Sequence, residues 1–392
     1  RMNILHLASW YPTEDSPING IFIERKIKAI SDGDKQNKHY FISLASASFA
    51  SLKKPLDFIR LKTKSNKPKL ISRGNLKMIN YQFIISHQRL FGTEVNQFQK
   101  QIDKLLKRFA INVNLIHAHV AMPAGAVALG MKQKFQIPYI ISEQMGEFPF
   151  AYLLSQKELI IESVQQAAQV IALSRFQKAE IEKFTGRKAE IIPNVVEVKN
   201  EKPFQQQAKA LNEKFQFILV GILSPVKGVD ILIAAASILK AKGIHHFHIT
   251  IAGGGKIEQD LQQLALQKNV DSYFSWTGAL RPDEVLQKIN ESDAFVCASR
   301  HESFGVALVE ALSLGKPVVA TRCGGPQDTV NEENGLLVDN ENPQALAEGL
   351  KWMMHNAGQF DSKKIAEAAV NKYGPAVISA QYLRLYEEIL KN

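Results

Sequence analysis

The chain has 392 residues, of which 45% are hydrophobic and 22% charged, so it is long enough for two α/β domains with separate cores. It has no apolar run long enough to span a membrane, and residues 2–8 lack the basic leader and apolar core of a signal peptide. Its two cysteines, Cys297 and Cys323, offer neither a disulfide framework nor the spacing of a zinc site. We therefore expect a cytoplasmic protein.

The net charge of +10 is concentrated in the first half of the chain. Residues 1–200 carry 29 Lys and Arg against 16 Asp and Glu, whereas residues 201–392 carry 19 against 22. Residues 51–77 alone hold nine basic side chains and one acid, Asp57. This stretch is either a solvated loop or a surface that meets anionic lipid head groups or an anionic acceptor. Nucleic acid is not expected as a partner, because the stretch has few aromatic residues and no recognisable binding module.

Segments typical of strands and of helices alternate along the first half of the chain. The pattern predicts a strand over residues 3–8 and a helix over residues 21–30, with Gly20 in the turn before it. A polar helix is predicted at about 94–109, and further strands at 39–45, 77–83, 114–118, 138–142, 169–174 and 191–194. Residues 198–212 are polar, and we interpret them as a linker.

The same alternation restarts after the linker. Strands are predicted at 215–221, 247–252, 273–277, 294–299, 317–321 and 336–339. Helices are predicted at 228–242, 257–267, from Pro282, and at 304–314, 343–355 and 375–390. The last of these has an apolar stripe formed by Val377, Ile378, Tyr382, Leu385 and Ile389. Because strands alternate with helices in both halves, the fold class is α/β, with two doubly wound parallel-sheet domains in tandem.

Two acids stand eight positions apart in the stretch from Ser299 to Leu312, namely Glu302 and Glu310. The helix predicted from Phe304 to Leu314 is apolar nearly all round, so we expect it to be buried. A buried carboxylate needs a partner. Glu310 therefore either forms a structural ion pair or contacts a ligand at the carboxyl end of a strand, where open α/β sheets bind ligands.

Glycines and one lysine follow several predicted strands. Such turns let phosphates approach backbone N–H groups, although tight turns also use glycine for geometry alone. The chain contains neither a dinucleotide-binding G-x-G-x-x-G fingerprint nor a P-loop. Lys227 stands in the loop after the first strand of the second half, where it is either solvated or able to reach a phosphate. The glycine positions are Gly20, Gly221, Gly253–Gly255, Gly278 and Gly324–Gly325.

Lys227 and the two acids together could span a nucleotide sugar. One acid would bind the ribose and the other the sugar, while the cation and a helix N-terminus would bind the diphosphate between them.

On these motifs the chain resembles the retaining glycosyltransferases of the GT-B fold, in family 4, typified by bacterial cell-surface and lipopolysaccharide transferases. The most specific motif is the pattern of Glu302, seven residues, and Glu310. Supporting motifs are Trp10-Tyr11-Pro12 with Gly20, His117-Ala118-His119, Ile192-Pro193-Asn194, Gly221 with Lys227-Gly228, and Gly324-Gly325.

The resemblance implies a role for each matching residue. Glu310 would bind the donor ribose, Glu302 would contact the transferred sugar, and His119 would lie near the acceptor, although a structural histidine is the alternative for His119. We therefore predict His119, Glu302 and Lys227 as catalytic residues. The predicted donor-binding residues are Gly20, Gly221, Lys227, Gly253, Gly278, Glu302, Phe304, Gly305 and Glu310.

One position departs from the family pattern. The family often has Arg directly after the glycine at Gly221, where this chain has Ile222. Lys227 then acts alone at the diphosphate, or Arg300 or another cation substitutes, or donor binding is weak.

The resemblance also implies an architecture and an activity. Residues 1–198, with the helix at 375–392 packed back on them, would form an acceptor-side domain that faces the donor-binding domain, residues 199–374, across a cleft. The activity would be transfer of a hexosyl unit, with retention, from a UDP or GDP sugar to a glycan or polyprenyl-linked acceptor. We expect no metal ion and no cofactor. The enzyme would be cytoplasmic, or peripheral on the inner face of the cytoplasmic membrane through residues 51–77.

Three other functions stay open. An epimerase or a phosphorylase could share the fold, and the residue Ile222 leaves room for a non-catalytic subunit that only binds a sugar nucleotide. Donor hydrolysis separates catalysis from binding alone.

Overall fold

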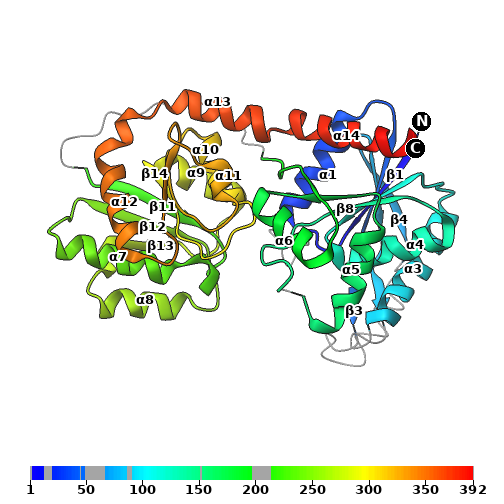
Figure 1. Ribbon diagram of the computed structural model, residues 1–392, viewed down its shortest axis with the longest axis horizontal. Coiled ribbons are helices and arrows are strands. Elements are labelled where there is room, and N and C mark those ends of the chain that lie inside the picture. The colour runs from blue at the N-terminus through cyan, green and yellow to red at the C-terminus, as the bar shows by residue number, and fades with distance from the viewer. Residues whose placement is uncertain are drawn as a thin grey trace. The chain divides into compact units, whose positions relative to one another are not determined.

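The structure is a computed structural model that describes residues 2–12, 20–44, 46–48, 67–85, 91–150, 152–196 and 213–391. The chain divides into two compact units, which we call unit 1 (residues 1–195 and 375–392) and unit 2 (residues 196–374). Each unit contains a sheet with helices on both faces, which can be followed in Figure 1. The predicted linker at residues 198–212 lies outside the described residues.

Unit 1 contains an eight-stranded sheet that is parallel except for one edge strand. Strand β1 lies between β2 and β7, so the direction of strand succession reverses at the boundary between β1 and β7. In open α/β sheets, ligands bind at the carboxyl ends of the strands beside such a reversal. The order is β10 (Glu190–Ile191), β9 (Gln169–Ala172), β8 (Tyr139–Ser142), β7 (Leu115–His119), β1 (Asn3–Ala8), β2 (Lys38–Ser43), β5 (Leu76–Asn80) and β4 (Lys69–Arg73).

Helices cover the two faces of this sheet in two groups. On one face, α1 (Ile21–Gly33) packs beside the C-terminal helix α14 (Pro375–Lys391), and the two helices lie next to each other in Figure 1. The other face carries the main core of unit 1. That core is covered by α3 (Phe91–Arg108), α4 (Ala126–Phe135), α5 (Lys157–Gln166) and α6 (Arg175–Thr185).

Unit 2 contains a six-stranded parallel sheet whose order reverses between β11 and β14. The order is β13 (Phe274–Trp276), β12 (Phe247–Ala252), β11 (Phe215–Val220), β14 (Ala294–Cys297), β15 (Val318–Thr321) and β16 (Gly335–Val338). One face packs against α7 (Val229–Ala241), α8 (Glu258–Gln267) and α12 (Pro343–Asn356). The remaining helices are α9 (Pro282–Glu291), α10 (Val306–Ser313), α11 (Pro326–Thr329) and α13 (Ser362–Tyr373).

The predicted alternation of strands and helices in parallel sheets is confirmed, with local differences. The basic stretch contains one strand, β4, that the sequence pattern did not predict. This strand pairs antiparallel with β5 in a hairpin at the edge of the sheet. Helix α10 is buried as expected, but it begins at Val306 rather than at Phe304. In the stripe of α14, Val377 is exposed instead of buried, and Tyr386 takes a core position.

None of the helices within the described residues combines the length and the apolar character needed to cross a membrane. Of the basic stretch 51–77, residues 51–66 lie outside the described part of the chain.

Candidate functional site

In unit 2, an ion pair marks the carboxyl ends of the strands where the strand order reverses. Lys227 closes a short 3-10 turn, Pro225–Lys227, in the loop after β11, and Glu302 follows β14. The Lys227 Nζ donates to the Glu302 Oε2 at 2.6 Å, with 27% and 17% of the two side chains exposed. Glu302 raises the pKa of Lys227, so this ammonium group is charged at neutral pH. The structure thus joins two predicted catalytic residues that are far apart in the sequence.

Three of the predicted glycines lie together beside this ion pair. The Gly253 N–H donates to the Gly278 carbonyl at 3.0 Å, and a Cβ on Gly253 would stand 1.9 Å from the Gly221 carbonyl oxygen. A Cβ on Gly221 would stand 3.1 Å from the Lys227 Cε. Each glycine alone was weak evidence for a ligand site. Because the three glycines have no side chains, the surface at the carboxyl ends of β11, β12 and β13 beside Lys227 is formed by backbone atoms.

The segment before α10 is held in place by backbone bonds and a positive φ. The Glu302 N–H donates to the Cys323 carbonyl at 2.9 Å, and the Gly325 N–H donates to the Glu302 carbonyl at 2.6 Å. Gly305 has φ +86° and precedes the first residue of α10. Only glycine adopts this conformation without strain. Gly305 therefore lets the chain turn directly from Glu302 into a helix whose N-terminus carries partial positive charge.

Two other predicted donor-binding residues belong to the same segment. The Phe304 side chain is buried and meets the Tyr373 ring edge-on, with 5.5 Å between the ring centroids. The backbone of Phe304 is therefore the part of this residue left to meet a ligand. Glu310 lies in α10 with 8% of its surface exposed, which agrees with the burial expected for this helix.

Arg300, the alternative cation for the diphosphate, is already hydrogen-bonded to groups of the protein. Its guanidinium donates twice to the Asp230 carboxylate, at 2.9 and 2.7 Å, and also to Glu341 Oε1 at 3.2 Å and the Pro225 carbonyl at 2.6 Å. These bonds use four of its five N–H donors. Arg300 thereby fixes the turn that carries Lys227, while the Ile222 side chain is exposed.

In unit 1, one predicted site residue ends a strand where the order reverses, and the other follows the neighbouring strand in the chain. His119 is the last residue of β7, fully buried, and Val120 after it has φ +82°, which is an outlier for a β-branched residue. Such strain tends to persist at functional sites. Gly20 has φ +72° at the start of α1, and a Cβ there would stand 2.9 Å from the Trp10 carbonyl carbon.

Two families of sequences match this chain over adjoining segments. The family described as Glycosyltransferase Family 4 matches residues 82–200, and the one described as Glycosyl transferases group 1 matches residues 200–372. The chain belongs to the family 4-like glycosyltransferases with the GT-B fold.

Relatives and solved structures extend this match over almost the whole glycosyltransferase. The putative teichuronic acid biosynthesis glycosyltransferase TuaC of Bacillus subtilis is 24% identical over 404 residues, covering 95% of this chain and 98% of TuaC. Sucrose-phosphate synthase from Thermosynechococcus elongatus superposes with a TM-score of 0.77 at 18% identity, covering 100% of both chains. Anabaena HepE in complex with UDP and glucose has a TM-score of 0.70 at 19% identity, covering 99% and 100%.

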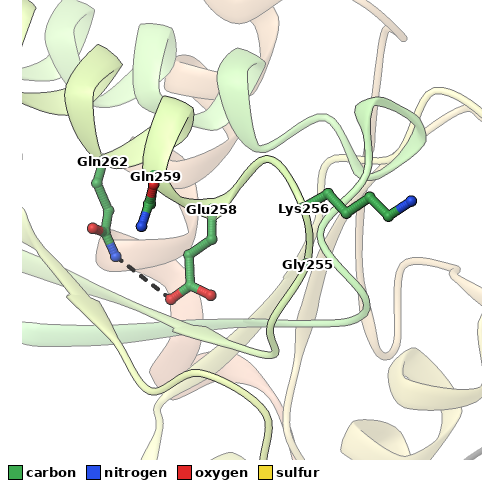
Figure 2. Close-up of a pocket in the computed structure, with 5 residues that line it drawn as sticks. All are labelled: Gly255, Lys256, Glu258, Gln259 and Gln262. Carbon is green, nitrogen blue, oxygen red and sulfur yellow. Dashed lines mark hydrogen bonds between the residues drawn. The ribbon is translucent and has the colours of Figure 1, made fainter.

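A polar pocket in the described part of unit 2 adjoins the predicted glycine run. It has a volume of about 520 Å³ and lies at the start of α8, directly after the glycines 253–255. In Figure 2 the side chains of Glu258 and Gln262 point toward each other, joined by a 3.5 Å hydrogen bond, while Lys256 points away from them. The run of three glycines was the sequence feature that indicated this place, because glycines leave the backbone accessible to a ligand.

The spacing of the two cysteines in the sequence did not indicate where they lie in the fold. Both thiols are buried, and the neighbouring Cys323 thiol lowers the pKa of Cys297, whose Sγ donates to the Ser299 hydroxyl at 3.7 Å. The charges of Lys227 and Glu302 act on both thiols. Their place beside the ion pair follows from the pairing of β14 with β15, which a search for cysteine spacing does not detect.

The chain does contain one Asp-x-Asp sequence, Asp32-Gly33-Asp34, but it does not form a metal site with its two carboxylates. It lies at the end of α1, where Asp32 pairs with Lys28 at 2.9 Å. Asp34 instead accepts hydrogen bonds from Asn37 and His39.

Proposed function

We propose that this glycosyltransferase moves a hexosyl unit from a nucleoside diphosphate sugar to a glycan or polyprenyl-linked acceptor, with retention at the anomeric carbon. Unit 2 would bind the donor and unit 1 the acceptor. The observation that carries the proposal is the Lys227–Glu302 pair, which lies beside three glycines at the carboxyl edge of the unit 2 sheet. Because the similar HepE structure is a complex with UDP and glucose, a UDP sugar is the first donor to test.

The ion pair suggests how the donor would bind. A diphosphate carries more negative charge than one carboxylate, so it would compete with Glu302 for the Lys227 ammonium group. Lys227 would then stabilise the departing diphosphate together with the N-terminus of α10. Glu302, released from Lys227, would accept hydrogen bonds from hydroxyl groups of the transferred sugar. The ion pair would thus hold both side chains in place before the donor arrives.

Retention would follow from attack on the same face of the sugar that the diphosphate leaves. Retaining glycosidases place two carboxylates on either side of the bond that breaks, and one of them acts as nucleophile. Here Glu302 is assigned to the hydroxyl groups of the sugar, and Glu310 lies on the buried helix α10 and is assigned to the ribose. We therefore propose front-face displacement in which binding orients the acceptor hydroxyl, without a metal ion.

The acceptor is proposed from the relatives of this chain. TuaC is a putative enzyme of teichuronic acid biosynthesis, which favours a cell-surface polysaccharide as the product here. The test is a panel of UDP and GDP sugars, scored first for donor hydrolysis and then for transfer to polysaccharide and polyprenyl-linked acceptors.

Glu310→Gln should weaken donor binding by about tenfold to 100-fold, since a hydrogen bond from a ribose hydroxyl to a charged acceptor contributes roughly 1.5–3 kcal/mol. Isothermal titration calorimetry with UDP measures the dissociation constant. Glu348→Gln is the matched control, because Glu348 lies on α12 of the same unit and is half exposed. Equal affinity of the Glu310→Gln and parent proteins would show that Glu310 does not bind the ribose.

We also propose that unit 1 docks on an anionic membrane. Three large apolar side chains are exposed in the loop between β8 and α5, with Phe150 81%, Leu153 58% and Leu154 91% exposed. The Tyr152 hydroxyl between them is anchored to the buried Glu143 carboxylate at 3.1 Å. Exposed apolar side chains on a loop that is fixed by a hydrogen bond to a buried residue are typical of an interaction surface. The basic charge of the first half of the chain favours anionic lipid as the partner.

Replacing Phe150, Leu153 and Leu154 with Ser should lower binding to liposomes that contain anionic lipid by at least tenfold, because each inserted side chain contributes about 2 kcal/mol. Sedimentation with anionic and with neutral liposomes measures the bound fraction. Leu266→Ser is the control, since Leu266 is a half-exposed leucine of unit 2. If the parent protein sediments equally with both kinds of liposome or with neither, the membrane proposal is wrong.

A further inference from the structure

A continuous chain of four buried side chains crosses the sheet of unit 1. His39 Nε2 lies 3.0 Å from Asp34 Oδ2, His6 Nε2 lies 3.0 Å from His39 Nδ1, and His119 Nε2 lies 3.2 Å from His6 Nδ1. Asp34 precedes β2, His39 is the second residue of β2, His6 is in the middle of β1, and His119 ends β7. The chain therefore runs from the amino edge of the sheet to the carboxyl edge.

The charges of these groups are set by their surroundings. Burial lowers the pKa of His6 and of His119 well below the ordinary value, and it lowers the pKa of His39 in spite of the hydrogen bond to Asp34. Burial acts to raise the pKa of Asp34, but the hydrogen bonds from Asn37, Gln36 and His39 outweigh it and keep the pKa below the usual value. At neutral pH, the chain therefore consists of three neutral imidazole rings, and the first of them is hydrogen-bonded to the ionised carboxylate of Asp34.

Only one arrangement of protons satisfies every bond in this chain. An ionised carboxylate only accepts hydrogen bonds, so His39 must donate from Nε2 and keep a lone pair on Nδ1. His6 must then donate from Nε2 to that lone pair, which leaves His6 Nδ1 as an acceptor. His119 must donate to it from Nε2. Each neutral ring carries one proton, and His119 therefore has a bare lone pair on Nδ1.

The lone pair at the end of the chain has no partner among the described residues. The Nζ of Lys26, which is also fully buried, likewise has no hydrogen-bond partner within the described chain. Burial lowers the pKa of Lys26 to about 7, and the Lys26 charge lowers the pKa of His119 further. A buried polar atom without a partner costs free energy, and the lone pair on the buried His119 Nδ1 has none within the described chain, so a hydroxyl group that donates to it would remove this cost.

We propose that Asp34, His39 and His6 are positioning residues that hold His119 in its Nε2–H form, so that its Nδ1 accepts a hydrogen bond from a substrate hydroxyl. This inference deepens the proposed glycosyl transfer and rests on it. His119 would then bind and orient a sugar hydroxyl rather than take up a proton. Front-face displacement fits this role, because the departing diphosphate can receive the proton of the acceptor hydroxyl.

A metal ion is the alternative ligand for the same histidines. Ring nitrogens of His6, His117 and His119 lie within 4.8 Å of one another. However, the rings of His117 and His119 are stacked, with centroids 4.0 Å apart and planes 26° apart, so they do not face a common centre. His117 also uses both nitrogens, facing the Tyr386 hydroxyl at 2.6 Å and the Ser142 hydroxyl at 2.7 Å. The hydrogen-bonded chain explains the geometry better than a metal centre does.

Long-range proton–nitrogen NMR of the full chain labelled with ¹⁵N-histidine tests the proposal without an activity assay. The spectrum of His119, assigned with the His119→Asn variant, should show a protonated Nε2 and an unprotonated Nδ1 throughout the neutral pH range. A protonated Nδ1 in the parent protein would overturn the proposal. So would a stoichiometric metal ion, measured by mass spectrometry of the purified protein, whose removal by chelation changes the His6 and His119 signals.

Variants then test the coupling along the chain. His39→Leu should leave His119 in a mixture of both neutral forms and lower kcat about tenfold with little change in the donor KM, whereas His39→Gln, which can both donate and accept, should restore most of the loss. Ser142→Ala is the control, because it removes a buried bond to His117 outside the chain. A His39→Leu protein with an unchanged His119 signal would contradict the coupling.

The two proposals fail in different ways. If the protein transfers no sugar, the NMR spectra still decide whether the chain fixes His119. If it does transfer sugar but His119 carries its proton on Nδ1, only the inference about the chain is wrong.

Discussion

Lys227→Met is expected to lower kcat/KM for the donor by about 10²–10³-fold, the loss typical when one preorganised group that stabilises a leaving group is removed. The ammonium group of Lys227 is partly buried and paired with Glu302 at 2.6 Å. Arg300 donates hydrogen bonds to Asp230, Glu341 and the Pro225 carbonyl. We therefore do not expect Arg300 to compensate in the way that the family arginine would.

The measurement is steady-state donor hydrolysis with the preferred nucleotide sugar, together with the dissociation constant for the free nucleoside diphosphate. Lys227→Arg keeps the charge and should lose less activity than Lys227→Met. Lys242→Met is the control, because Lys242 also pairs with a glutamate of unit 2, Glu348, but on an exposed surface. The melting temperature should change little, since a partly exposed ion pair contributes about 1 kcal/mol or less. Unchanged hydrolysis by Lys227→Met would place the diphosphate elsewhere.

Much of the fold could be predicted because the signals are local in sequence. Parallel strands in α/β units are often continuous apolar runs, and the segments around Phe217 and Val296 have this pattern and are buried. Strand β4 was missed because its five residues, Lys69–Arg73, are all exposed. An edge strand of this kind has no apolar face to show in the sequence, and only its antiparallel bonds to β5 define it.

The candidate site was predictable to a different extent in each unit. In unit 2 the residues Glu302 and Gly305 belong to one motif, so the sequence indicated them together. The partner of Glu302 was not predictable, because Lys227 is 75 positions away and meets it only where β11 and β14 pair. In unit 1 the sequence indicated Gly20 and His119, but not the residues that bond to His119. Its bonds through His6 and His39 depend on the strand order β7, β1, β2, which no local pattern reveals.

Gly253→Ala is expected to lower the melting temperature of unit 2 by about 10 °C, corresponding to a loss of roughly 3–5 kcal/mol. Gly253 has φ +142°, a conformation that is nearly exclusive to glycine. An added Cβ would also stand 1.9 Å from the Gly221 carbonyl oxygen and 2.9 Å from its carbon. Both atoms belong to the backbone after β11, so no side chain can rotate away to relieve the contact.

Two further glycine variants separate the causes of this effect. Gly243→Ala tests the positive φ alone, because Gly243 has φ +74° and no atom within 4 Å of the added Cβ, and it should cost about 1–2 kcal/mol. Gly221→Ala would meet the flexible Lys227 side chain at 3.1 Å, so it should melt close to the parent protein while losing donor binding. If Gly253→Ala melted like Gly243→Ala, the close approach of Gly253 to Gly221 would not contribute. We instead expect Gly253→Ala to have the lowest melting temperature of the three variants, because its Cβ would displace backbone atoms. Gly221→Ala should lose activity rather than stability, because its Cβ would displace the Lys227 side chain.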